Sequence, residues 1–94
     1  MFEIKKDEKG TIHLAGRLDA SQVEKARTVF DRIETSCLLD LEGLEYISSA
    51  GLGCLIQAQK RLGESEETLR LTGLQGNIRE IFRISGLDRV IPVE

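Results

Sequence analysis

Two adjacent serines, Ser48 and Ser49, have the best position for chemistry in this chain because they open a glycine-rich segment. The segment 48–53 follows an apolar run and leads into a spacing typical of an amphipathic helix. A serine at the start of a helix has two uses, which are to cap free backbone N–H groups or to carry a phosphate that those groups stabilise. Spacing alone leaves both uses open, and the simple cap is the more common of them.

The first turn of this expected helix is unusual in composition. Gly51 and Gly53 both lie in it, although glycine costs about 1 kcal/mol relative to alanine in a helix interior. We therefore expect another backbone, or a phosphate, to approach this turn closely. Residues 50–56 include no acid, so the positive end of the helix dipole is free to receive an anion, including a phosphate on a capping serine.

Catalytic and nucleotide-binding patterns around these residues are incomplete. A serine hydrolase elbow requires glycine two residues before the nucleophile, and Ile47 stands there for Ser49. The single histidine, His13, falls in an expected hairpin. A dinucleotide fingerprint begins at Gly51, but Ile56 takes the place of its last glycine.

Metal and thiol chemistry have equally little support. Cys37 and Cys54 are too few and too far apart for a disulfide framework or a zinc site, and we expect both to be buried apolar side chains. Asp19 and Asp40 lie near strand ends and would be a metal pair only if the fold joined them. No metal or cofactor is expected, and a small enzyme using Ser49 or Cys54 is a third functional hypothesis.

Length and charge exclude other classes of protein. The chain has 94 residues, 40% hydrophobic and 31% charged, which suits one globular domain. Its net charge is −3 with no strongly basic segment, so nucleic-acid binding is not expected. No apolar run approaches the ~20 residues that cross a bilayer, and no secretory leader is recognisable. Neither membrane insertion nor export is expected, and the predicted location is cytoplasmic.

Hydrophobic patterning predicts the elements that must position the two serines. Predicted strands span residues 2–6, 11–15, 37–41, 68–72 and 90–93, and predicted helices span residues 21–34, 49–62 and 77–85. The order is β-β-α-β-α-β-α-β. It predicts one α/β domain with a mixed sheet and right-handed crossovers.

Caps and breakers set the predicted boundaries. Ser21 with Glu24 forms a capping-box pattern, and Asn77 with Glu80 forms another. The run 37–41 is nearly continuous in apolar residues, which predicts a central strand covered on both faces. Leu52, Leu55, Ile56 and Leu62 are expected on the buried side of the second helix. Glycines expected to end strands or helices are Gly16, Gly43, Gly63 and Gly86.

Four segments match a known family in order and spacing. They are Gly16-Arg17-Leu18-Asp19, Leu39-Asp40-Leu41, Tyr46-Ile47-Ser48-Ser49-Ala50-Gly51-Leu52-Gly53 and Phe82-Arg83-Ile84-Ser85-Gly86-Leu87. Together they resemble the STAS domain, in particular the small bacterial anti-sigma-factor antagonists. The resemblance covers essentially the whole chain, so residues 1–94 are expected to be one STAS domain. It implies a four- to five-stranded sheet flanked by about three to four helices and no catalytic activity.

The resemblance also implies a partner-switching cycle. The unphosphorylated form binds an anti-sigma factor that is a serine kinase of the histidine-kinase-like ATPase fold, and this binding releases sigma. Phosphorylation by that kinase ends the interaction, and a PP2C-type phosphatase restores it. The family's phosphoacceptor aligns with Ser49, with Ser48 as the alternative. Ser48 itself stands where the family usually has an aspartate.

The partner surface implied by the resemblance combines two segments that each follow a strand. Its residues are Leu18, Asp19, Ala20, Ser21, Ser48, Ser49, Ala50, Gly51, Leu52 and Gly53. The same surface serves family members in other assemblies. An alternative function is therefore a constitutive scaffold or subunit, in a stress-sensing complex, a lipid-transport ATPase or a partner-switching system unrelated to sigma.

Overall fold

A four-stranded mixed sheet forms the centre of the computed structural model, which describes residues 1–94. Its strands, in spatial as well as chain order, are β1 (Phe2–Lys6), β2 (Ile12–Leu18), β3 (Cys37–Ile47) and β4 (Leu69–Thr72). β1 is antiparallel to β2, while β2, β3 and β4 are parallel to their neighbours. The predicted α/β class with a mixed sheet is confirmed.

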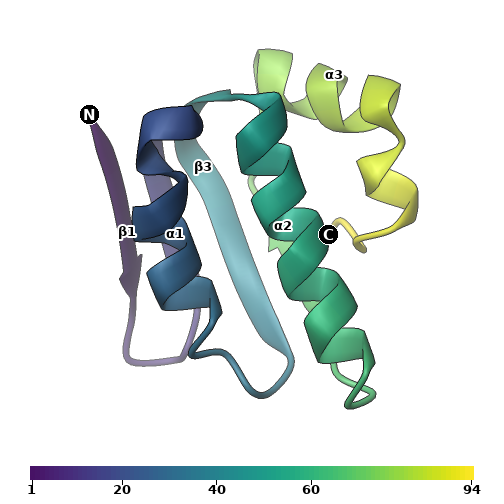
Figure 1. The fold of residues 1–94 in the computed structure, drawn as a ribbon. Helices are drawn as coiled ribbons and strands as arrows, with labels where there is room; N and C mark the ends of the chain where they lie inside the picture. The colour runs from purple at the N-terminus through teal and green to yellow at the C-terminus, as the bar shows by residue number, and fades with distance from the viewer.

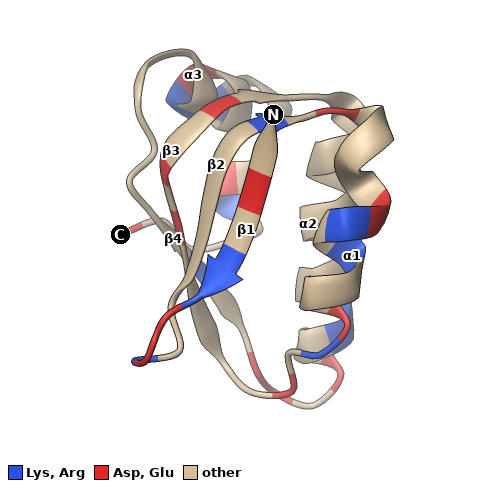
Figure 2. Cartoon of the chain, turned by 90° about the vertical axis from the view of Figure 1, so that its left-hand side faces the viewer, with Lys and Arg blue, Asp and Glu red and all other residues tan.

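Helices α1 (Val23–Phe30) and α2 (Ser49–Gly63) lie side by side over one face of the sheet (Figure 1). The view in Figure 2 shows both helices on the same side of the strands. Helix α3 (Gly76–Ser85) lies apart from them and contacts β3. Two short 3₁₀ helices, η1 (Ala20–Gln22) and η2 (Leu87–Arg89), precede α1 and follow α3. None of the helices has the length and apolar character that a membrane crossing requires.

The core lies between the sheet and the helices, and it is built mainly from aliphatic side chains. Along β3, Leu39 and Leu41 are buried, whereas Leu38 and Asp40 remain partly exposed. The prediction that this strand is covered on both faces is therefore wrong. Side chains along the strand alternate between the two faces of the sheet, and only one of these faces packs against α1 and α2. The nearly continuous apolar run hides this alternation in the sequence.

Strands β2 and β3 are longer than predicted. Pairing between them continues through Gly16 and Gly43, the glycines that were expected to end the strands. Gly16 lies inside β2 with a φ of 88°, and a side chain there would meet the Met1 carbonyl. Gly43 lies inside β3 against Ala15 of β2. The register between the two strands shifts at two places, as expected where β-bulges accommodate extra residues. The predicted loop over residues 42–48 is thus mostly strand, and it brings β3 up to Ser48.

The first helix is shorter than predicted at both ends. Asp19, not Ser21, provides the capping carboxylate, and it caps η1. Helix α1 starts at Val23 without a side-chain cap and ends at Phe30. The capping-box prediction for Ser21 and Glu24 is wrong because the chain makes a 3₁₀ turn before the helix begins.

The later boundaries agree in part with the predictions. Helix α2 ends at Gly63, but the left-handed residue that follows is Glu66, so Gly63 is not a glycine cap. Helix α3 begins at Gly76, and the Asn77 side chain donates to Glu45 O at 3.4 Å instead of capping. Gly86, with a φ of 80°, ends α3 as predicted.

The predicted fifth strand, residues 90–93, is reduced to one bridge between Val93 and Leu71 of β4. The Leu71 amide donates to Pro92 O at 2.8 Å, and the Glu94 amide donates to Leu71 O at 2.7 Å. Because the preceding residues form η2, too little extended chain remains for a strand. The C-terminal segment still protects the β4 edge.

The sheet face away from α1 and α2 carries a small ionic cluster around His13. Its Nε2 lies 2.8 Å from Asp7 Oδ2, and its Nδ1 lies 3.2 Å from Asp40 Oδ2. The hydrogen bond to Asp7 raises the pKa of His13 above its ordinary value of 6.5, and the same bond lowers the pKa of Asp7. The protonated imidazole is thus favoured in the folded state.

This cluster predicts a pH effect of defined sign. Because the folded pKa of His13 is raised, its stabilising contribution is present below pH 6.5 and disappears as pH rises through the folded value. We expect an NMR titration to give a His13 pKa above 6.5, and Asp7→Asn to move it back toward 6.5. Asp31→Asn, which removes an exposed carboxylate elsewhere, is the control and should leave the titration unchanged. An unaltered His13 pKa in Asp7→Asn would contradict the assignment.

Candidate functional site

Ser48 caps helix α2. Its backbone is extended, with φ −87° and ψ 171°, and its Oγ accepts a hydrogen bond from the Gly51 amide at 3.1 Å. Its carbonyl oxygen accepts from the Leu52 amide at 2.9 Å. The Ser48 hydroxyl is therefore already engaged in stabilising the first turn of the helix.

The same turn is seated directly on the end of β2. The Ser48 amide donates to Leu18 O at 2.9 Å. A Cβ atom on Gly51 would lie 2.8 Å from Ile47 Cγ1 and 2.9 Å from Leu18 O. The expected close approach of a backbone is thus confirmed at Gly51. At Gly53 a Cβ would meet nothing within 4 Å, so that glycine faces open space.

Ser49 is the first residue of α2, as predicted, and it is exposed. Unlike its neighbour, its hydroxyl makes no hydrogen bond within the chain. The amides of Ser49 and Ala50 are also without an acceptor, and the first turn contains no acidic residue. A free hydroxyl therefore lies beside free N–H donors at the positive end of a helix.

The segment after β2 borders this turn. The Asp19 carboxylate accepts hydrogen bonds from the Ser21 amide at 3.0 Å and from Ser21 Oγ at 2.6 Å. The bond from the Ser21 hydroxyl lowers the pKa of Asp19. The structure thus brings together the two predicted segments, 18–21 and 48–53. It does not pair Asp19 with Asp40, which contacts His13 instead, and it contains no cluster of three or more metal-ligating side chains.

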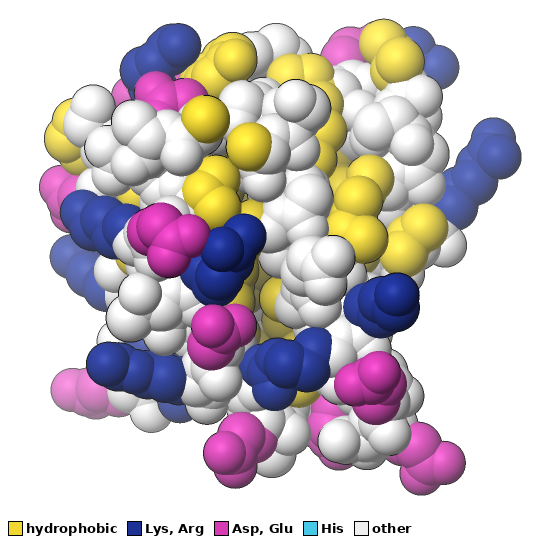
Figure 3. Space-filling model, viewed as in Figure 1, with side chains coloured by type: hydrophobic (Ala, Val, Ile, Leu, Met, Phe, Trp, Pro, Cys, Tyr) yellow, Lys and Arg dark blue, Asp and Glu magenta, His cyan; other side chains and the backbone are white.

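The start of α2 itself carries no charged side chain. No charged residue occurs between Glu45 and Lys60, and the start of α2 is seen in the upper middle of Figure 3 as uncharged side chains with charges around them. Leu52 is partly exposed, and one turn later Ile56 is 38% exposed. The prediction that Ile56 is buried is wrong, and Ile56 belongs to this surface although the sequence analysis did not include it. The absence of charged residues between Glu45 and Lys60 is the sequence feature that indicates an apolar surface here.

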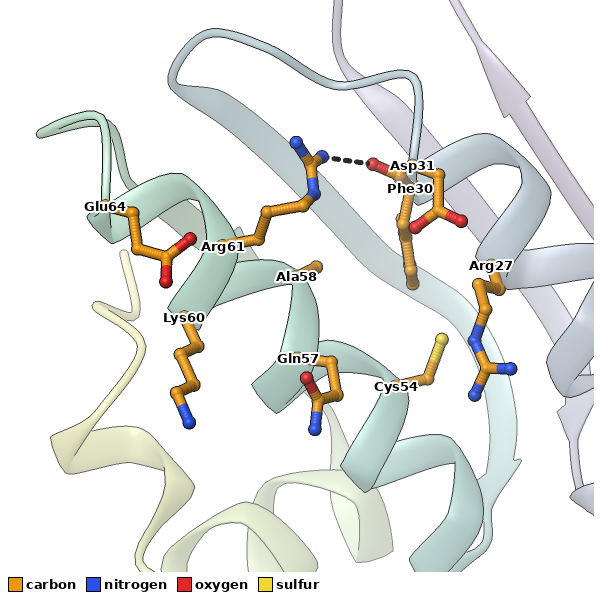
Figure 4. A pocket seen from close by; sticks show the side chains of 9 residues that line it. All are labelled: Arg27, Phe30, Asp31, Cys54, Gln57, Ala58, Lys60, Arg61 and Glu64. Carbon is orange, nitrogen blue, oxygen red and sulfur yellow. Dashed lines mark hydrogen bonds between the residues drawn. The ribbon is translucent and has the colours of Figure 1, made fainter.

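Cys54 lines a groove between α1 and α2 (Figure 4). The groove is crossed at its end by Arg61, whose guanidinium donates to Phe30 O at 2.8 Å and to Ile33 O at 2.5 Å. Cys54 is only 4% exposed, and burial raises the pKa of its thiol. Burial likewise raises the pKa of Cys37. Neither thiol has the lowered pKa that a nucleophilic cysteine needs.

Ser49 also lacks the base that a catalytic serine requires. His13 lies on β2 five residues before Leu18, which corresponds to roughly 16 Å of extended chain, and both of its ring nitrogens face carboxylates. The geometry offers binding and modification at Ser49 and no activated nucleophile.

Comparison with known families agrees with this arrangement. A family model described as "Mlab, STAS domain" matches residues 1–92. The chain belongs to the STAS domain family. Of the four segments that carried the resemblance, this STAS domain gathers two, at the ends of β2 and β3, into one surface.

Two relatives of this STAS domain are anti-sigma-factor antagonists by name. The putative anti-sigma factor antagonist BtrV of Bordetella bronchiseptica is 41% identical over 63 residues, which cover 67% of this chain and 54% of BtrV. The chain thus spans about half the length of that relative. The anti-sigma-B factor antagonist of Listeria monocytogenes is 34% identical over 87 residues, covering 88% of this chain and 76% of that protein.

A solved structure shares the fold of this STAS domain. It is the Bacillus cell fate determinant SpoIIAA in the phosphorylated form, with a TM-score of 0.71 and 21% identity. The match covers 100% of this chain and 91% of SpoIIAA.

The two glycines of the first turn predict opposite responses to alanine. Gly51→Ala forces a methyl group against Leu18 and Ile47, and we expect it to lower the free energy of unfolding by about 1–3 kcal/mol. Gly53→Ala adds a methyl group in open space within a helix, and we expect it to raise that free energy by about 0.5–1 kcal/mol. Urea unfolding of both variants tests this. Equal responses would contradict the different surroundings of the two positions.

Proposed function

We propose that this STAS domain, over residues 1–94, is an anti-sigma-factor antagonist whose binding is switched off by phosphorylation of Ser49. The names of the relatives support the antagonist role, because BtrV and the Listeria protein are both described as anti-sigma-factor antagonists. The structural neighbour SpoIIAA is described in a phosphorylated form. A phosphorylation switch is thus in keeping with the structures that share this fold.

The observation that carries the proposal is the different hydrogen bonding of the two serine hydroxyls. Ser48 has its hydroxyl in the helix cap, whereas Ser49 offers an exposed hydroxyl with no partner. A kinase could modify Ser49 without breaking any hydrogen bond of the folded chain. Modification of Ser48 would instead place a phosphate on the oxygen that accepts the capping hydrogen bond from the Gly51 amide.

A phosphate on Ser49 would change the surface far more than the fold. It would add about −1.5 to −2 charges at neutral pH to a helix start that carries no charged side chain. Within the domain, the free amides and the helix dipole would receive it, with a stabilising effect of about 0.3–1 kcal/mol. Against a partner shaped for a bare hydroxyl, the buried and unpaired charge would cost about 2–5 kcal/mol of binding free energy.

The proposed partner is an anti-sigma factor that is also a serine kinase of the histidine-kinase-like ATPase fold. It would contact Leu18–Ser21 and Ser48–Gly53, together with Ile56. A PP2C-type phosphatase would restore the unphosphorylated form. Because these partners act on transcription, we propose that the domain works in the cytoplasm and as a binding protein rather than as an enzyme.

A constitutive subunit is the second candidate function. The chain matches a STAS domain model, and the resemblance extends to family members that use the same surface as constitutive scaffolds or subunits. A subunit of this kind would remain bound to its assembly whether or not Ser49 is modified. Co-purification from the native host in equal amounts for the wild type, Ser49→Ala and Ser49→Asp would favour this candidate over the switch.

The switch predicts opposite phenotypes for alanine at the two serines. Ser49→Ala should keep the melting temperature and the partner but lose phosphorylation. Ser48→Ala should still be phosphorylated but lose about 1 kcal/mol of stability, because the cap is removed. Peptide mapping by mass spectrometry after treatment with the kinase, together with thermal melts, measures both effects.

The phosphorylated protein provides the decisive comparison. It should keep its melting temperature while its affinity for the kinase falls by about 30- to several-thousand-fold. Phosphate found only at Ser48 would overturn the assignment of Ser49. A phosphorylated form that melts many degrees lower would show that the switch works by unfolding.

Arginine substitution at two glycines of α2 tests the position of the partner surface. Gly53 and Gly63 both have open space where a side chain would be, but only Gly53 lies beside Ser49. We expect both Gly53→Arg and Gly63→Arg to fold. Gly53→Arg should weaken kinase binding by about tenfold or more, equal to at least 1.4 kcal/mol, whereas Gly63→Arg should bind like the wild type in isothermal titration calorimetry. Unchanged binding by Gly53→Arg would place the partner elsewhere.

A further inference from the structure

A second groove lies at the opposite end of the sheet from Ser49. It has a volume of about 570 Å³, and it is lined by the β1–β2 turn, the segment after α1 and the start of β3. It includes Ile12, the first residue of β2, and Cys37, the first residue of β3. The proposed partner surface lies at the last residues of these same strands, about 20 Å away along β2. We call this second groove the basal groove.

The basal groove is strongly basic in an acidic protein. The charged residues that line it are Lys5, Lys6, Lys9, Arg32, Arg70 and Glu34. Five of the six are cationic, although the chain as a whole has a net charge of −3. The positive charges come from three separate segments, and Figure 2 shows the basic end of β1 among them.

Most of these cations have no acidic partner. Arg70 is paired with Glu94, but Lys5, Lys6, Lys9 and Arg32 form no salt bridge. The nearby Asp7 forms no salt bridge with them, since its carboxylate contacts His13 and the amides of Lys9 and Thr11. The side chains that line the groove therefore carry more positive than negative charge, even with Glu34 and the Arg70–Glu94 pair counted.

Two of the positive charges act on Cys37, which lines the groove. Lys6 lies over the turn, since a Cβ on Gly10 would be 3.9 Å from Lys6 Cε. At the Cys37 thiol, burial raises the pKa, while the positive charges of Lys6 and Arg70 act in the opposite direction. Lys6 and Arg70 come from different strands, so positive charge acts on this thiol from two elements, while the charge of Asp7 acts against it.

The groove also has an apolar wall. Val29 and Ile33 are partly buried and pack against the core, and Leu38 is partly exposed on β3. A purely hydrophilic anion would leave this wall in contact with water. A ligand that has both an anionic group and an apolar portion would use both the charges and the wall.

We propose that the basal groove binds a small amphipathic anion, a molecule with one phosphate, sulfate or carboxylate group joined to a short apolar chain. The anionic group binds among Lys5, Lys6, Lys9 and Arg32. The apolar chain lies along Val29 and Ile33. Because the groove is remote from Ser49, the ligand and the proposed kinase bind without competing for the same surface.

Three probes separate the contributions of charge and apolar chain. The ¹⁵N-labelled full chain is titrated with n-octyl phosphate, with inorganic phosphate and with n-octanol, and amide shifts are followed by NMR. Octyl phosphate should shift the amides of Gly10, Thr11, Ser36 and Leu38 and leave Ser49 and Gly53 unchanged. It should bind at least about tenfold more tightly than inorganic phosphate, because only octyl phosphate gains the apolar contact.

Variants test the charges directly. The double variant Lys6→Gln/Lys9→Gln should weaken octyl phosphate binding at least about fivefold, and raising the salt concentration should weaken it further. Lys60→Gln, a matched control in the groove between α1 and α2, should change it less than about twofold. Thermal melts of each variant check that it is folded.

The proposal is overturned if the shifts map to another surface, if the control and the groove variants bind equally, or if inorganic phosphate binds as tightly as octyl phosphate. It is also overturned if the domain binds phosphatidylglycerol vesicles but not octyl phosphate in solution, because the ligand source would then be a membrane surface. None of these readouts depends on Ser49, so their failure leaves the proposed switch intact.

Discussion

The seating of helix α2 on the end of β2 is the contact on which the rest of the site depends. It has two parts. The Ser48 amide donates a hydrogen bond to Leu18 O, and the first helical turn packs so closely against Leu18 that only glycine fits at position 51. This contact orients α2 over the sheet and brings the segment after β2 beside the helix start. It also sets which side of the first turn faces solvent. Since consecutive residues of a helix point about 100° apart, a fixed orientation gives neighbouring residues different surroundings.

Stability and the proposed function thereby depend on different residues of one short segment. Ser48 and Gly51 face the chain, where they cap the helix and allow the close approach to Leu18. Ser49 and Gly53 face outward, where a hydroxyl or the lack of a side chain has no internal use. A modification at Ser49 can therefore change binding without a comparable change in folding. This separation suits a switch that must be reversed many times by enzymes.

Charge is distributed along the sheet axis in a way that the net charge does not reveal. The end with Ser49 carries no charged residue from Ile47 to Gln59, while the end with Lys6 and Arg32 is strongly basic. The start of α2 is sensitive to one added phosphate, because its own side chains carry no charge that would mask it. A cluster of unpaired cations is instead suited to an anionic ligand. One small domain thus presents two surfaces with different electrostatic requirements.

Local patterns in the sequence determined the α/β class, the start of α2 at Ser49 and the family. Helix periodicity, glycine content and the motif around Ser49 depend on neighbouring residues, so they can be recognised without coordinates. Tertiary structure decided the rest. Pairing with β2 extended β3 through Gly43 to Ile47, and the packing of α2 exposed Ile56. The two serines are the same residue type, and only the hydrogen bond from the Gly51 amide to Ser48 Oγ shows which of them caps the helix. The basal groove joins residues from three distant segments, and such contacts depend on the path of the whole chain.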